Sequence, residues 1–285
     1  MNQHNKQKPI QGELFSTAPA TAQKPALTIF NRAVWPYIHS GSTTKTLELQ
    51  WLAALVPAFT IFIYNDSTQL TVALCAVAGS VIAEISWRKF NTAANDRPFI
   101  YALYNGLLAS ILLPPDIPWW LVIAGMMLAI SLTYIAQYKL HSRMVNPALL
   151  MAAALSLIYP FSFQEIPIAG MPLLVAIALG AMFLAISKAT TLLPSLVAVL
   201  MLVLPRCLTA TAGIPATAMN VSALLFLIPD YDGSPLILRA KLLQALAAAT
   251  LTLALSAWTT LAAPLLIALL ITSLLTPALD LIHAR

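Results

Sequence analysis

Few side chains in this sequence could do chemistry, and three asparagines stand out because they lie in or beside long apolar runs. Asn105 and Asn220 lie inside such runs, and Asn146 opens another. An amide group in hydrocarbon costs on the order of several kcal/mol unless it is hydrogen-bonded, so each should face protein or an internal cavity. Two interpretations stay open: hydrogen bonds between helices, or the lining of a cavity that binds a cofactor. We therefore take all three as candidate cofactor-binding residues.

Three carboxylates are candidates for an ion pathway. Glu84 lies near the end of an apolar run, four residues before Arg88, and this spacing predicts an ion pair across one helical turn. Carboxylates inside membrane-spanning segments also mark ion or proton relays, so that role stays open for Glu84. Asp116 and Asp230 each follow a proline that ends an apolar run, and we expect them to be solvated or to cap a helix.

The sequence does not indicate other catalytic chemistry. The four histidines have no metal-ligand spacing, and two cysteines are too few for a metal or disulfide framework. There is neither a glycine-rich phosphate loop nor a nucleophile elbow. We expect no metal site, no self-contained catalytic site and no nucleic-acid partner. Tryptophans near the ends of apolar runs are typical of anchors at a membrane surface: Trp51, Trp87, Trp119 and Trp120.

The apolar runs that must position these residues belong to a membrane protein. The chain is 60% hydrophobic and 9% charged, whereas soluble domains carry about 25% charged residues. After a polar tail at 1–48, the runs predict an all-α protein with about ten transmembrane helices. The predicted spans are residues 49–64, 69–87, 99–113, 118–137, 144–160, 168–187, 190–205, 212–229, 236–257 and 261–281.

The placement of positive charge predicts the orientation of the spans. Lys and Arg concentrate in the cytoplasmic loops of membrane proteins. If the N-terminal tail is cytoplasmic, every Lys and Arg except Arg206 lies on the inside. With ten spans both termini are then cytoplasmic, and we expect a multi-pass protein of the bacterial inner membrane.

Repeated prolines and asparagines divide the spans into two halves. A shift of 115 residues places Asn105 on Asn220, and NGLLASILLPPD (105–116) then lies beside NVSALLFLIPD (220–230). We expect five-helix repeats at 49–160 and 161–285, inverted because each contains an odd number of spans. Interrupted helices at matching positions of inverted repeats point to a central site. The prolines that coincide at a shift of 117 residues are Pro118 with Pro235, Pro147 with Pro264, and Pro160 with Pro277.

Five motifs in order resemble the NqrB/RnfD family, the membrane subunits of the Na+-translocating NADH:quinone reductase and of the Rnf electron transport complex. The motifs are PYIHSGSTTKT, LLASILLPPDIPWW, VNPALLMAAALSLIYP, IPDYDGSP and LLITSLLTPALDLIHAR. The resemblance covers about residues 35–285 and implies ten spans in two inverted halves. It also implies a subunit that couples flavin-linked electron transfer to ion movement across the membrane.

The sequence departs from the family pattern at the site of covalent FMN. Family members carry FMN on a threonine in a long loop between the fifth and sixth spans. Here that connection is FSFQEIP, residues 161–167, which has no threonine. Thr190 and Thr191 follow a Ser-Lys-Ala, but they fall in a link that the topology places inside. We expect no covalent FMN, and a non-covalent flavin, riboflavin or FMN, stays open.

The resemblance also implies partners, and it leaves other functions open. The expected partners are the lipid bilayer and other membrane subunits of a redox complex, including a flavinylated or iron–sulfur protein. One alternative is a small-solute channel or transporter, because urea transporters resemble this architecture of five plus five inverted spans. A second alternative is a membrane scaffold that holds flavinylated partners.

Overall fold

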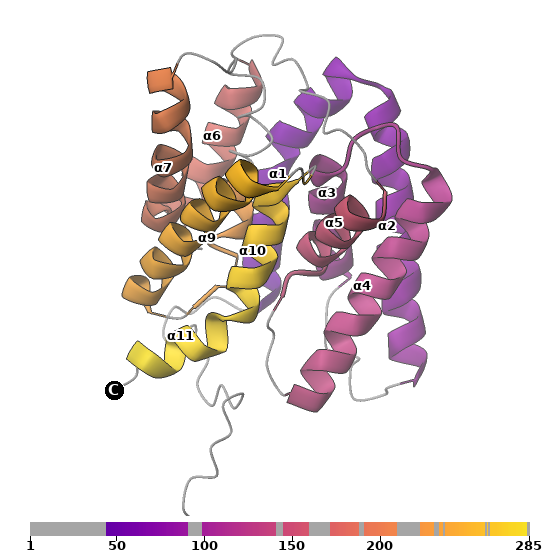
Figure 1. The fold of residues 1–285 in the computed structure, drawn as a ribbon. Coiled ribbons are helices and arrows are strands. Elements are labelled where there is room, and N and C mark those ends of the chain that lie inside the picture. Colours follow the sequence, from indigo (N-terminus) through magenta and orange to yellow (C-terminus); the bar gives the residue numbers. More distant parts are fainter. Residues whose placement is uncertain are drawn as a thin grey trace, which may run out of the picture.

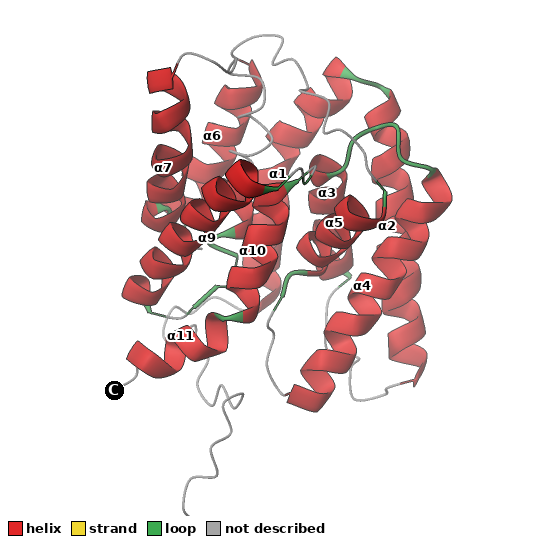
Figure 2. Ribbon diagram, in the orientation of Figure 1, coloured by secondary structure: helices red, strands yellow, loops and turns green. Residues whose placement is uncertain are grey.

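The protein is a bundle of α-helices (Figures 1 and 2). The computed structural model describes residues 44–90, 99–140, 145–159, 172–187, 191–209, 223–230, 234–235, 237–259, 261 and 263–283. Within these ranges the chain forms helices and no strand. The helices are α1 (Thr44–Asn65), α2 (Thr68–Phe90), α3 (Ile100–Leu112), α4 (Trp119–Leu140), α5 (Pro147–Ile158), α6 (Pro172–Ile186), α7 (Leu193–Thr209), α9 (Leu238–Trp258), α10 (Pro264–Leu274) and α11 (Thr276–His283).

Four helices are long and apolar enough to cross a membrane. Their apolar stretches in α1, α2, α4 and α9 have 20, 22, 20 and 21 residues, and a bilayer crossing needs about 20. These helices coincide with four of the predicted spans, so the prediction of a helical membrane protein is confirmed. Residues 223–227 are also helical; the remainder of the predicted span 212–229 lies mostly outside the described residues, as does the tail up to residue 43.

Three interior helices are shorter than a bilayer crossing. The lengths of α3, α5 and α10 are 13, 12 and 11 residues, which is about 17–20 Å at 1.5 Å per residue. Helix α3 ends where the sequence predicts, because Leu113 is extended (φ −106°, ψ 140°) in front of Pro114. A residue before proline is disfavoured in the helical conformation.

The predicted last span, 261–281, is wrong as a single helix. The structure divides it into α10 and α11, which meet at Leu275. The physical reason is Pro277, which has no backbone N–H and whose ring would clash with the carbonyl of residue 273 in a continuous helix. Proline is instead well tolerated in the first turn of a new helix, and this is its place in α11.

Close backbone contacts hold neighbouring helices together. Helix α1 packs against α6, and a Cβ placed on Gly180 would lie 2.2 Å from the carbonyl oxygen of Ala54. Helix α2 packs against α3 and α4, and a Cβ on Gly106 would lie 2.7 Å from Cα of Val77. Small residues let helices approach this closely inside membranes, where the hydrophobic effect does not drive helix association.

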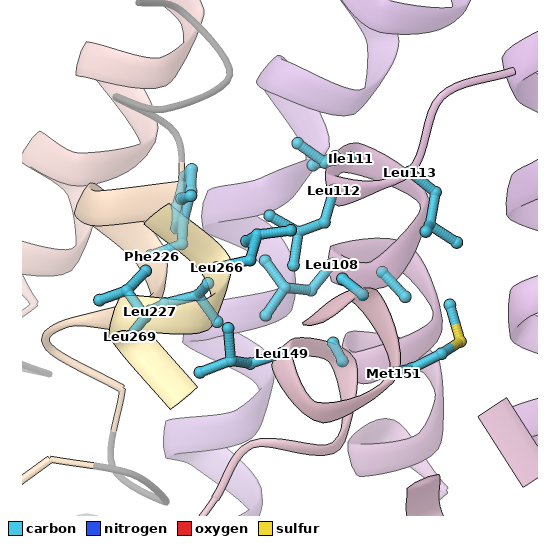
Figure 3. Close-up of a cluster of buried hydrophobic side chains, with 14 of the residues drawn as sticks. Leu108, Ile111, Leu112, Leu113, Leu149, Met151, Phe226, Leu227, Leu266 and Leu269 are labelled. Carbon is cyan, nitrogen blue, oxygen red and sulfur yellow. The ribbon is translucent and has the colours of Figure 1, made fainter. Parts of the chain in front are cut away.

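The centre of the molecule is an apolar cluster built by the short helices. Figure 3 shows Leu108 and Leu112 of α3, Leu149 of α5, Phe226 of the 223–227 turn, and Leu266 and Leu269 of α10 converging on one region. All of these side chains are buried. The long helices surround this cluster and present exposed leucines outward, as expected for a surface in contact with lipid: Leu74, Leu128, Leu132, Leu179 and Leu200.

Candidate functional site

Asn146 builds the start of α5. Its side-chain oxygen accepts hydrogen bonds from the backbone N–H groups of Ala148 (2.8 Å) and Leu149 (3.3 Å). Its backbone is extended (φ −68°, ψ 129°) and Pro147 is the first helical residue. Asparagine as the N-cap followed by proline is a favoured way to begin a helix, because both leave few unsatisfied N–H groups.

The same asparagine binds a carboxylate that is distant in sequence. Asn146 Nδ2 donates to Asp230 Oδ2 at 2.5 Å, and the exposed fractions of the two residues are 2% and 1%. The N-terminus of a helix carries a partial positive charge, which favours a carboxylate nearby. The prediction of a solvated Asp230 is therefore wrong: the start of α5 supplies the hydrogen bond and the field that water would otherwise supply.

Asn105 lies on α3 and is fully buried. Its Nδ2 donates to the carbonyl oxygen of Tyr101 at 2.9 Å, one turn earlier. Its Oδ1 has no hydrogen-bond partner among the described residues. Asn220, its expected counterpart, lies outside those residues, so the approach of Asn105 to Asn220 stays a prediction. An unpartnered buried acceptor is what a ligand with an N–H group would use.

Glu84 forms a second buried polar cluster between α2 and α4. Arg88 Nε lies 2.9 Å from Glu84 Oε1, which confirms the predicted ion pair. Tyr134 of α4 donates its hydroxyl to Glu84 Oε2, and the guanidinium carbon of Arg88 lies 4.1 Å from the centre of the Phe99 ring. Both carboxylate oxygens therefore have a partner, although Glu84 is only 1% exposed.

Two other predicted residues have contrasting surroundings. Asp116 is exposed, as predicted, and follows the end of α3. The prediction that Trp51 lies at the membrane surface is wrong, because its side chain is fully buried. Its ring packs edge-on against Tyr104, with 5.9 Å between the ring centres. The reason is that α1 lies between α3 and α6, so its middle turns face protein.

Sequence reasoning missed Gln69, which caps the end of α3. Its side-chain nitrogen donates to the carbonyl oxygens of Ser110 and of Leu113, the latter at 3.0 Å. The last four carbonyls of any helix lack partners within the helix, and in a membrane they need protein donors. An amide at the start of the preceding span was the available signal. Among the described residues, no group of three His, Cys, Asp or Glu could hold a metal ion.

These features define a class: a helical membrane protein whose short, interrupted helices meet at buried amide and carboxylate side chains. The sequence pattern of the NQR2, RnfD, RnfE family matches residues 32–214, which is more than half of the chain. The chain therefore belongs to that family.

Individual relatives support the same assignment. The chain is 29% identical over 137 residues to a membrane component of the ion-translocating oxidoreductase complex, RnfD, of Escherichia coli (strain K12 / DH10B). The same identity holds for the corresponding proteins of E. coli O157:H7 and of Shigella boydii serotype 18. In each case the match covers 46% of this chain and 38% of the relative. The matched region thus spans well under half the length of these relatives.

Proposed function

We propose that this chain is an integral membrane subunit of an electron transport complex of the Rnf/Nqr kind, in which flavin-linked electron transfer is coupled to ion movement. The observation that carries the proposal is the family match over residues 32–214. The relatives are named as subunits of an ion-translocating oxidoreductase complex. Other membrane subunits, including a flavinylated or iron–sulfur protein, are the expected partners, in the bacterial inner membrane.

The proposed architecture has ten spans in two inverted five-helix repeats, with both termini in the cytoplasm. Support is strongest for the last two helices of each half. Helices α5 and α10 both begin at a proline, Pro147 and Pro264, which lie 117 residues apart (264 − 147). Helix α4 packs against α2 and α5, and α9 packs in the same way against α7 and α10. The pairs α1–α6 and α5–α10 also touch, as a two-fold axis between the halves requires.

The proposed cofactor is a non-covalent flavin, riboflavin or FMN, held near Asn105, Asn146 and Asn220. The Oδ1 of Asn105, which has no partner among the described residues, supports this because the isoalloxazine ring offers an N–H donor. Asn146 has less capacity, because its oxygen already accepts two backbone N–H groups and its nitrogen binds Asp230. The lack of threonine in FSFQEIP supports a chain without covalent FMN. The proposed ion pathway uses Glu84, Asp116 and Asp230.

Purification of the tagged chain in a mild detergent, from cells that naturally make it, tests the proposal. The expected result is a stable complex with at least one flavin- or iron–sulfur-containing protein. The matched experiment places the chain alone in liposomes, where we expect no uptake of urea or similar small solutes. Solute uptake without redox partners would contradict the proposal and favour a channel. Flavinylated partners around a chain that binds no flavin itself would favour a scaffold.

A further inference from the structure

Three aromatic rings from three helices form a stack beside Glu84. The ring centres of Trp87 (α2) and Tyr134 (α4) lie 5.3 Å apart with 33° between the planes. Those of Tyr134 and Tyr101 (α3) lie 6.3 Å apart with 28° between the planes. The two tyrosines are buried, whereas Trp87 is partly exposed in the last turn of a membrane-length helix. The stack therefore connects a membrane surface with the protein interior.

The partners of Tyr134 suit a residue that loses an electron. Tryptophan and tyrosine are the side chains that one-electron oxidants attack most readily, and rings in van der Waals contact exchange an electron efficiently. Oxidation of tyrosine at neutral pH requires loss of its phenolic proton. The Tyr134 hydroxyl already donates to Glu84 Oε2, and Arg88 stabilises the ionised form of that carboxylate through Oε1 at 2.9 Å. A proton acceptor is thus in place.

We propose that Tyr134 is a redox-active tyrosine, with Trp87 as its electron relay and Glu84 as its proton acceptor. An oxidant of the radical class, such as a lipid peroxyl radical, takes one electron and one proton from Trp87 and becomes a hydroperoxide. Tyr134 then gives an electron to the Trp87 radical, which regains its indole proton from water. The phenolic proton of Tyr134 passes to Glu84. The products are a tyrosyl radical at Tyr134 and a neutral Glu84 side chain.

Aromatic rings also stack for packing alone, so the test must keep the stack and remove the chemistry. Tyr134→Phe retains the ring and removes the transferable proton. Glu84→Gln retains a hydrogen-bond acceptor and removes the base. Tyr104→Phe is the matched control, because Tyr104 is a buried tyrosine on α3 that contacts Trp51 and is in no ring contact with Trp87 among the described residues.

The experiment is pulse radiolysis of the detergent-solubilised full chain with the azide radical, which oxidises tryptophan selectively. The background carries Phe at positions 35, 119, 120 and 258, so that Trp87 is the accessible target and Trp51 is buried. We expect tryptophanyl absorbance to be replaced by tyrosyl absorbance at a rate independent of protein concentration. Tyr134→Phe should abolish this conversion, and Glu84→Gln should slow it about 100-fold, as loss of a positioned base does.

The control and the spectrum complete the test. Tyr104→Phe should leave the conversion rate unchanged, and the electron paramagnetic resonance spectrum of frozen samples should show one tyrosyl radical that Tyr134→Phe removes. Each variant is first shown to elute from gel filtration like the parent. Conversion at the parent rate in Tyr134→Phe would overturn the proposal and leave the stack as packing. Conversion at the parent rate in Glu84→Gln would overturn the role of Glu84 as the base.

Discussion

Helices α5 and α10 begin in the same way but are capped differently. Each starts at a proline in a buried turn. Before α5, Asn146 accepts two backbone N–H groups and binds Asp230. Before α10, Ala263 makes no side-chain cap and has a different backbone conformation (φ −134°, ψ 67°). Asp116, which aligns with Asp230 in the predicted repeat, is exposed.

Polar function is therefore concentrated at the start of α5. A proline is enough to start a helix at each place, so the shared fold does not need the cap. The amide and the carboxylate meet at α5, where they join residues 84 positions apart. A buried carboxylate in a membrane protein is costly unless it is paired, so its retention at this place is a sign of function.

The largest effect is expected from making α5 resemble α10. Asn146→Ala removes the cap and leaves Asp230 without its Asn146 partner. Removal of one partner from a buried charged contact costs about 3–5 kcal/mol, so the unfolding transition in detergent should move to clearly lower temperature. The double variant Asn146→Ala with Asp230→Leu should recover much of this loss, because no buried charge is left. A double variant as unstable as the single one would show that the buried charge is not the cause.

A second test asks how much the joint between α1 and α6 depends on backbone contact rather than on polar groups. Gly180→Ala places a Cβ 2.2 Å from the Ala54 carbonyl oxygen, and such overpacking costs about 1–3 kcal/mol. Gly125→Ala is the matched control, because its nearest neighbour is the flexible Met151 side chain at 3.1 Å. The control should be neutral or slightly stabilising in a thermal melt. Equal melting temperatures for the two variants would refute the importance of this backbone contact.

A third test concerns the cap that Gln69 gives to α3. Gln69→Leu keeps the size of the side chain and leaves the carbonyls of Ser110 and Leu113 without that donor. A buried acceptor that loses its partner costs about 1–3 kcal/mol. Hydrogen exchange of the α3 amides should then accelerate more than that of α4. Unchanged protection of α3 would show that another group takes the place of Gln69.

The smallest effect is expected from the reverse graft. Ala263→Asn should supply an N-cap to α10 and stabilise the protein by about 0.5–1 kcal/mol. A small rise in melting temperature, independent of salt, is the expected result. A fall would mean that the space beside Ala263, which is 5% exposed, cannot accept the larger side chain.

Features set by local chemistry could be predicted from the sequence. Hydropathy predicts the long helices, Pro114 predicts the end of α3, and the spacing of Glu84 and Arg88 predicts their ion pair. Each of these depends on residues within one or two helical turns. The family resemblance, carried by the same proline-containing motifs, is also confirmed.

Features set by tertiary contacts could not be predicted. The sequence neighbours of Asp230 are turn residues and indicate solvent, whereas its actual partner is 84 positions away. The place of Trp51 near a helix end indicates the membrane surface, yet α3 and α6 pack against its helix and the side chain is buried. Tyr134 reaches Glu84 from 50 positions away. The flavin site stays a prediction, because Asn220 lies outside the described residues.

Flavin-linked electron transfer through this chain is tested most simply by the visible spectrum of the detergent-purified protein, before and after acid precipitation. We expect flavin absorbance in the native protein that passes into the acid supernatant, as a non-covalent cofactor does. Asn105→Leu should lower the flavin bound per chain, with Gly125→Ala as the matched control. Flavin that stays in the acid pellet would contradict the proposed lack of covalent FMN. A colourless protein from cells able to make flavin would contradict flavin-linked electron transfer through this chain.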